Sequence, residues 1–96
     1  MSVNVIATTR IKPEAADAFA RGMERTLVET RAFDGCISVY GYRHQDDPTH
    51  IIAIEEWETR AHYEAYVAWR RSQGTMDRLA AILQAPISVE YFDKIA

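Results

Sequence analysis

Alternating apolar positions open the chain. Residues 3–11 are rich in Val, Ile and Thr, a composition typical of a strand. Successive side chains of a strand point to opposite faces, so the segment divides into two sets. One face carries Val3, Val5, Ala7, Thr9 and Ile11, and the other carries Asn4, Ile6 and Thr8. Both faces include apolar residues, which predicts a central strand covered on both sides.

A helical period follows over residues 13–31. Pro13 suits the first position of a helix, and Glu14 suits the helix dipole in the first turn. Apolar and small residues then recur every three or four positions: Ala15, Ala18, Phe19, Gly22, Met23, Thr26 and Leu27. The spacing predicts an amphipathic helix that ends at Asp34-Gly35.

Two strands, 36–43 and 51–58, are predicted on either side of a turn at Asp46-Asp47-Pro48. They are close enough in sequence to form a hairpin. In the second strand, alternation separates Ile51, Ala53, Glu55 and Trp57 from Ile52, Ile54 and Glu56.

A broken helix and a final strand complete the pattern. We expect Thr59 to be the N-cap of a helix that runs to about Arg71 and is interrupted at Gly74. Thr75 is expected to cap a short helix over 76–83, and Pro86 stops this helix before a strand over 87–95.

The element order β-α-β-β-α-α-β predicts an α+β fold of the ferredoxin-like βαββαβ type, with an antiparallel sheet. Right-handed crossovers place the helices on one face of that sheet. Four apolar positions exceed what one helical layer can cover: Ile52, Ile54, Val3 or Ile6, and Val39. Because large exposed apolar patches mark interfaces, we expect a homodimer whose two sheets pack face to face.

Length and charge narrow the class of protein. Ninety-six residues fit a single domain over 1–96. A net charge of −3 provides no basic field for nucleic acid or an anionic membrane, so neither is an expected partner. The sequence has no signal-peptide pattern and no apolar run of membrane-spanning length, which makes the cytoplasm the expected location. The single cysteine, Cys36, is expected to be a small buried hydrophobe.

Trp57 and Glu55 are the candidate site residues of the strand 51–58. A tryptophan at a strand end can be core packing or the wall of a pocket between sheet and helices. Glu55 shares its face, where a covered carboxylate must be paired, reach solvent at an edge, or be neutral. The functional alternative is a base or orienting group with a raised pKa. The residue types alone leave these alternatives open.

The following helix carries an aromatic stripe of Tyr63, Tyr66, Val67 and Arg70, in line with Thr59. Such a stripe can be core or interface, or it can supply a pocket with rings and hydroxyl donors. Arg70, Arg71 and Arg78 can all be solvated, but one turned inward could hold an anionic oxygen.

Metal and nucleotide sites have no support in the sequence. His44, His50 and His62 lack metal-ligand spacing and are expected at the surface. There is no glycine-rich phosphate loop and no dinucleotide fingerprint. We therefore expect no metal and no cofactor.

Four short motifs, in order, carry a family resemblance along nearly the whole chain. They are Ile11-Lys12-Pro13-Glu14, Asp34-Gly35-Cys36-Ile37-Ser38, the turn from Arg43 to Pro48, and Glu55-Glu56-Trp57-Glu58. In these segments the chain resembles the antibiotic-biosynthesis-monooxygenase-like members of the dimeric α/β-barrel superfamily. The resemblance implies one such domain over residues 1–96, with the Trp57 face of the sheet under the helices.

One branch of that family consists of cofactor-free monooxygenases that oxidise phenols to quinones. Their site is similar here at Trp57, at Tyr63 and, with a one-residue shift, at Arg78. It differs at Ala53, where those enzymes have Asn. A haem-degrading branch has Asn, Trp and His at positions that are Ile6, Tyr66 and Met76 here, so the resemblance disfavours haem degradation. A third branch isomerises small phosphorylated sugars or binds ligands, and nothing in the sequence excludes it.

The resemblance therefore implies an O₂-dependent oxidation of a small phenolic or quinol substrate in an apolar pocket. The expected catalytic residues are Tyr63, Glu55 and Arg78, and the expected substrate-binding residues are Trp57, Tyr66, Ala53 and Phe19. The expected partners are a second copy of the chain and a small aromatic molecule. The alternative is a non-catalytic small-molecule-binding or stress-response module, or an isomerase of the same superfamily.

Overall fold

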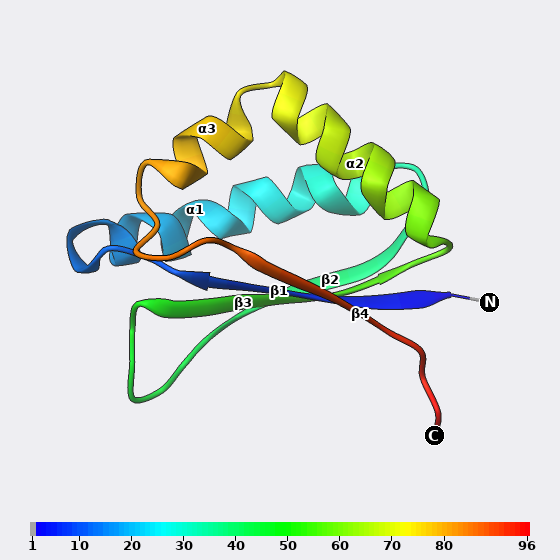
Figure 1. The fold of residues 1–96 in the computed structure, drawn as a ribbon, viewed down its shortest axis with the longest axis horizontal. Coiled ribbons are helices and arrows are strands. Elements are labelled where there is room, and N and C mark those ends of the chain that lie inside the picture. The colour runs from blue at the N-terminus through cyan, green and yellow to red at the C-terminus, as the bar shows by residue number, and fades with distance from the viewer. Residues whose placement is uncertain (1) are drawn as a thin grey trace.

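The computed structural model describes residues 2–96. In chain order its elements are β1 (Val3–Arg10), α1 (Pro13–Ala32), β2 (Cys36–Arg43), β3 (His50–Trp57), α2 (Arg60–Ser72), α3 (Thr75–Ala80) and β4 (Ser88–Phe92) (Figure 1). This order confirms the predicted α+β, ferredoxin-like architecture.

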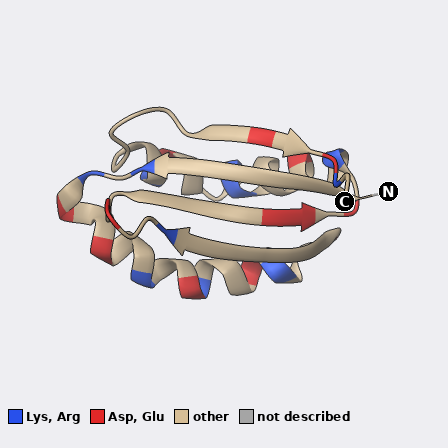
Figure 2. Ribbon diagram, turned by 90° about the horizontal axis from the view of Figure 1, so that it is seen from below, with Lys and Arg blue, Asp and Glu red and all other residues tan. Residues whose placement is uncertain are grey.

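One four-stranded antiparallel sheet, in the order β2-β3-β1-β4, forms the base of the fold. All three helices cover the same face, as predicted (Figure 1). β1 and β3 are the inner strands, which agrees with the central position expected of residues 3–11. From below, the four strands are seen with no helix in front of them (Figure 2).

The core lies between sheet and helices in two clusters. Val5, Trp57 and Tyr63 form one, and Ile11, Ala16 and Ile51 form the other. Cys36 packs against the first cluster and is half-buried, which agrees with a hydrophobic role. On α1 the buried residues are Ala16, Leu27 and Thr30, whereas Ala18, expected inside, is exposed. The apolar stripe is therefore rotated slightly from the one that the sequence spacing favoured.

The apolar residues that were not expected to fit together under one helical layer divide between the two faces of the sheet. Val39 is buried and Val3 packs against the Trp57 cluster, so both lie under the helices. A register irregularity between Cys36 and Ser38 accompanies the inward position of Val39. The open face carries a band of tyrosine and isoleucine side chains, in which Tyr40 pairs with Ile54, Ile54 pairs with Ile6, and Tyr42 pairs with Ile52. Tyr40, Tyr42 and Ile54 are 55%, 52% and 39% exposed, so the band is accessible in the protomer.

The segment after α2 differs from the sequence prediction in its boundaries. Gly74, at φ 76°, is the N-cap of α3, and Thr75 is the first helical residue rather than the cap. α3 ends at Ala80 instead of about residue 83, because Leu83 forms an isolated bridge with Ile11. Pro86 therefore does not end the helix. β4 covers Ser88–Phe92, shorter than the predicted 87–95.

Within residues 2–96, none of the helices combines the length and apolar character that a membrane crossing requires.

Candidate functional site

A cavity of about 390 Å³ lies between the sheet and the helices. Its floor includes two small residues that pair across the strands, Ala7 of β1 and Ala53 of β3. Gly41 of β2, which pairs with Ala53, lies outside the cavity. Met23 of α1 lies so close over Gly41 that a Cβ there would displace it. A space of this size, mainly apolar with a few polar groups, is typical of a small-molecule site.

Glu55 contributes a carboxyl group to the floor of the cavity from β3. It is 6% exposed, and it accepts a hydrogen bond of 2.9 Å at Oε1 from the indole N–H of Trp57. Burial raises the pKa of Glu55 to about 7, against a smaller lowering by the Trp57 bond. The alternation of β3 places both side chains on the covered face, as predicted. Glu55 has no salt-bridge partner among residues 2–96, so the ion-pair reading does not apply.

Trp57 is fully buried and does not line the cavity. Its ring contacts Tyr63 and Tyr66, with centroids 5.8 Å and 5.1 Å away. The structure therefore places Trp57 behind the cavity, as a core residue that also holds Glu55.

Tyr63 lines the cavity from α2, where Thr59 caps the helix by accepting the His62 N–H at 3.1 Å. Tyr63 is 5% exposed, and its ring also contacts Tyr91 at 5.8 Å. Burial, with the nearby Glu55 charge, raises the pKa of the Tyr63 hydroxyl well above its usual range. The phenol is therefore neutral at physiological pH, and its hydroxyl makes no hydrogen bond to any part of the chain that the structure describes.

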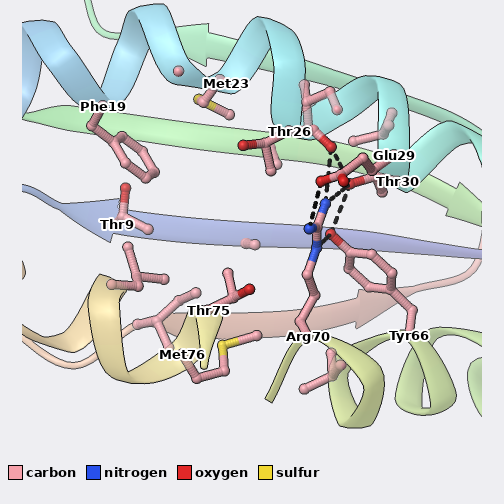
Figure 3. A pocket seen from close by; sticks show the side chains of 18 of the residues that line it. Thr9, Phe19, Met23, Thr26, Glu29, Thr30, Tyr66, Arg70, Thr75 and Met76 are labelled. Atoms are coloured by element: carbon pink, nitrogen blue, oxygen red, sulfur yellow. Dashed lines mark hydrogen bonds and ion pairs between the residues drawn. The ribbon is translucent and has the colours of Figure 1, made fainter. Parts of the chain in front are cut away.

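Tyr66 and Arg70 join α2 to α1 at one end of the cavity (Figure 3). The Arg70 guanidinium donates to the Tyr66 hydroxyl at 2.9 Å, to Glu29 Oε1 at 3.0 Å, to the Thr26 carbonyl at 2.9 Å and to Thr30 Oγ1 at 3.2 Å. Burial opposes the charge, but the bonds to Tyr66 and Glu29 outweigh it and raise the pKa of Arg70. The Tyr66 hydroxyl is also 2.7 Å from Thr30 Oγ1, so it is already committed to protein partners.

Arg78, Ala53 and Phe19 also line the cavity. Arg78 is exposed on α3 and donates to the Gln73 carbonyl at 3.2 Å and to Thr75 Oγ1 at 3.4 Å. Phe19 projects from α1 at the opposite end from Arg70 (Figure 3). The structure thus brings six of the seven expected site residues to one cavity, and Trp57 stands just behind it.

Sequence reasoning did not select Arg70, although it named that residue as one of three candidates for an inward arginine. The available signal was its position four residues after Tyr66, which puts both side chains on one helix face. Thr26, Glu29 and Thr30 on α1 had no such signal, because their partners lie about forty residues away along the chain.

Asp34, Glu58 and His62 bring three potential metal-ligand atoms within 4.8 Å of one another. The group lies outside the cavity, and its two carboxylates are exposed. His62 Nδ1 is already bonded to Thr59 Oγ1 at 2.7 Å. An exposed ion-pair cluster explains this arrangement, and we assign no ion to it.

The sequence profile of the family "Antibiotic biosynthesis monooxygenase" matches residues 2–78, most of the chain. The chain belongs to this family. None of the curated proteins matches it. Among solved structures, one of an antibiotic biosynthesis monooxygenase is 28% identical, with a TM-score of 0.86, over 98% of this chain and 99% of the other.

Two more distant structures agree on the fold of this monooxygenase-family chain. A conserved protein from Methanosarcina mazei Go1 is 20% identical, covers 99% of this chain and 94% of its own, and has a TM-score of 0.86. A protein from Mycobacterium tuberculosis is 22% identical, covers 100% and 97%, and also has a TM-score of 0.86.

The three positions at which the chain differs from the haem-degrading branch do not all lie at the cavity. Tyr66 and Met76 line it, whereas Ile6 pairs with Ile54 in the band on the open face of the sheet.

Proposed function

We propose that this family member oxidises a small phenolic or quinol molecule with O₂ in the cavity, without a cofactor. The observation that supports the proposal is the pair of polar groups left available there. Glu55 makes a single hydrogen bond within residues 2–96, to Trp57, and the Tyr63 hydroxyl makes none. Both side chains line a space that is otherwise mainly apolar.

In this proposal Glu55 is the base that takes the phenolic proton. A pKa of about 7 suits that task at physiological pH, because a general base works best when its pKa is near the operating pH. The phenolate is then the electron donor to O₂. One oxygen atom enters the ring carbon para to the hydroxyl, and the other leaves as water, so a phenol and O₂ give a quinone and water.

The other site residues hold the substrate. Tyr63 donates a hydrogen bond to the substrate oxygen, and the rings of Phe19 and Tyr66 contact the aromatic part. Ala53 provides room above the sheet. Trp57 supports the site by holding Glu55, and Arg78 interacts with the outer end of the substrate. Positioning and exclusion of water are the contributions asked of the protein.

The working form in this proposal is a cytoplasmic homodimer. The exposed band of Tyr40, Tyr42 and Ile54 supports it, because an apolar sheet face of this kind is stabilised by a second copy packed against it.

The alternative function is a ligand-binding or stress-response module, or an isomerase, using the same cavity. Ala53 supports this alternative, since it lacks the polar side chain that the oxidising branch has there. Among residues 2–96 no unpaired cation lies beside Glu55, which supports it as well.

Oxygen uptake with a panel of phenols and quinols, run beside a thermal-shift screen of the same compounds, tests the proposal. Uptake with quinone formation is expected from at least one compound that also raises the melting temperature. Compounds that stabilise the protein but consume no oxygen would favour the binding module.

A further inference from the structure

The charges that line the cavity are unevenly placed. Its lining includes two arginines, Arg70 and Arg78, and two glutamates, Glu29 and Glu55. Arg70 bonds to Glu29 at 3.0 Å and spends three further bonds on Tyr66, Thr26 and Thr30, so its charge is balanced and its donors are largely used. Arg70 is therefore not available to bind an anion.

The floor of the cavity offers an acceptor and a hydroxyl. Glu55 and Tyr63 are 6% and 5% exposed, and they come from the sheet and the base of α2. Glu55 has one oxygen free of hydrogen bonds from the described residues, and Tyr63 has a free hydroxyl. These groups fit a neutral hydroxyl group, which can donate to the carboxylate and accept from the phenol.

The remaining cation lies at the outer rim. Arg78 is exposed, and its guanidinium reaches the Gln73 carbonyl at the α2–α3 junction. That junction is the part of the fold farthest from the sheet (Figure 1). The two bonds that hold Arg78 go to a neutral carbonyl and a neutral hydroxyl, and no acidic side chain of residues 2–96 forms an ion pair with it.

We infer that the cavity binds an aromatic molecule in one orientation, with an uncharged hydroxyl at Glu55 and Tyr63 and any anionic substituent at the rim beside Arg78. The inference rests on the proposed function for its aromatic ligand, and it adds the polarity and orientation of that ligand. A carboxylate beside the hydroxyl is excluded, because it would face Glu55 in a buried space where the described residues provide no free cation. A carboxylate at the far end is accepted, because it meets Arg78.

Three related compounds test this orientation: a naphthol, the hydroxynaphthoic acid with its carboxylate next to the hydroxyl, and the isomer with its carboxylate on the other ring. Affinities are measured by calorimetry about one pH unit above the Glu55 pKa of about 7, where Glu55 is ionised. We expect the naphthol and the far-end isomer to bind, and the adjacent isomer to bind at least ~10-fold more weakly, since like charges at close range in a buried site repel strongly.

Two variants separate charge from shape. Glu55→Gln keeps the size of the side chain and an acceptor for the Trp57 N–H, but removes the negative charge. It should restore binding of the adjacent isomer. Arg78→Gln should weaken the far-end isomer several-fold and leave the naphthol unchanged. Arg71→Gln, an exposed arginine on α2 that does not line the cavity, is the matched control and should change none of the three.

Equal binding of the adjacent isomer and the naphthol by the wild type would overturn the inference. So would continued exclusion of the adjacent isomer by Glu55→Gln, an equal loss of all three ligands in Arg78→Gln, or no binding of any of them. Oxygen uptake is scored separately with the same compounds. If the compounds bind in the expected order but no oxygen is consumed, this inference stands and the proposed oxidation is contradicted. If the naphthol and the adjacent isomer are turned over equally, the proposed oxidation stands and this inference is contradicted.

Discussion

The indole N–H of Trp57 donates a 2.9 Å hydrogen bond to the carboxyl group of Glu55, two residues earlier on the same strand. Period-two alternation puts both side chains under the helices. The tryptophan is fully buried and the glutamate faces the cavity, so a core residue donates a hydrogen bond to a carboxyl group of the cavity. This pair leads to the first two predictions.

Glu55→Gln should stabilise the protein, and only at higher pH. The native carboxyl keeps its proton up to a pKa of about 7, whereas its ordinary value is 4.5. Between these values the native state binds more protons than the unfolded state, so stability falls as the pH rises. Removing the carboxyl should leave stability unchanged below the lower value and raise it by at most ~3 kcal/mol above the higher one.

Urea unfolding at a series of pH values measures this difference. Glu64→Gln, at an exposed position on α2, is the control and should show no such trend. A pH-independent gap between wild type and Glu55→Gln would show that Glu55 is not a buried, raised-pKa group.

Trp57→Phe should shift the ionisation of Glu55 further upward. The substitution keeps an aromatic ring and removes the N–H that favours the carboxylate. A hydrogen bond to a charged group contributes about 1.5–3 kcal/mol, which corresponds to a rise of roughly 1–2 pH units in the pKa of Glu55. The pH profile of ligand binding or turnover measures the shift. An unchanged profile with reduced stability would mean that Trp57 acts in packing alone.

Tyr63→Phe and Tyr66→Phe should differ although each removes one hydroxyl group. The Tyr63 hydroxyl is uncommitted, so its loss should lower turnover by ~10²-fold, the scale of one positioned donor to a developing negative charge, with little change in stability. The Tyr66 hydroxyl bonds to Thr30 and Arg70, so its loss should cost ~1–3 kcal/mol of stability instead.

Steady-state kinetics and thermal unfolding of the two variants provide the comparison. If the cavity only binds ligands, Tyr63→Phe should keep its ligand-induced melting shift, and no oxygen uptake should be seen in either protein.

Ile54→Asp should convert a dimer into a monomer. Ile54 belongs to the exposed band on the open face, and a charge at the centre of an apolar interface is costly to bury. Light scattering should give about twice 11.0 kDa for the wild type and about 11.0 kDa for the variant. Val28→Asp, at a position on α1 that is 61% exposed, is the control and should remain dimeric. A wild type of single-chain mass would contradict the proposed interface.

Local chemistry along the chain was enough to predict most of the fold. Alternation identified the covered face of β3, Thr59 was recognised as the cap of α2, and the order of the elements led to the ferredoxin-like topology. The boundaries of α3 were predicted less well. Leu83 leaves the helical path to bridge Ile11, a partner more than seventy residues away, and local propensity carries no information about such a contact.

The candidate site was likewise predicted in part from the sequence and in part decided by the tertiary structure. The sequence determined which residues share a face, because strand and helix periods are properties of neighbouring residues. These periods placed Glu55 on the same strand face as Ala53, and Tyr63 on the same helix face as Tyr66 and Arg70. Only the tertiary structure decided that Trp57 lies behind the cavity, that Arg70 rather than Arg78 turns inward, and that Glu29 balances its charge. Burial and pairing depend on which elements meet across the core, and a pKa near 7 for Glu55 arises from that burial and not from the residue itself.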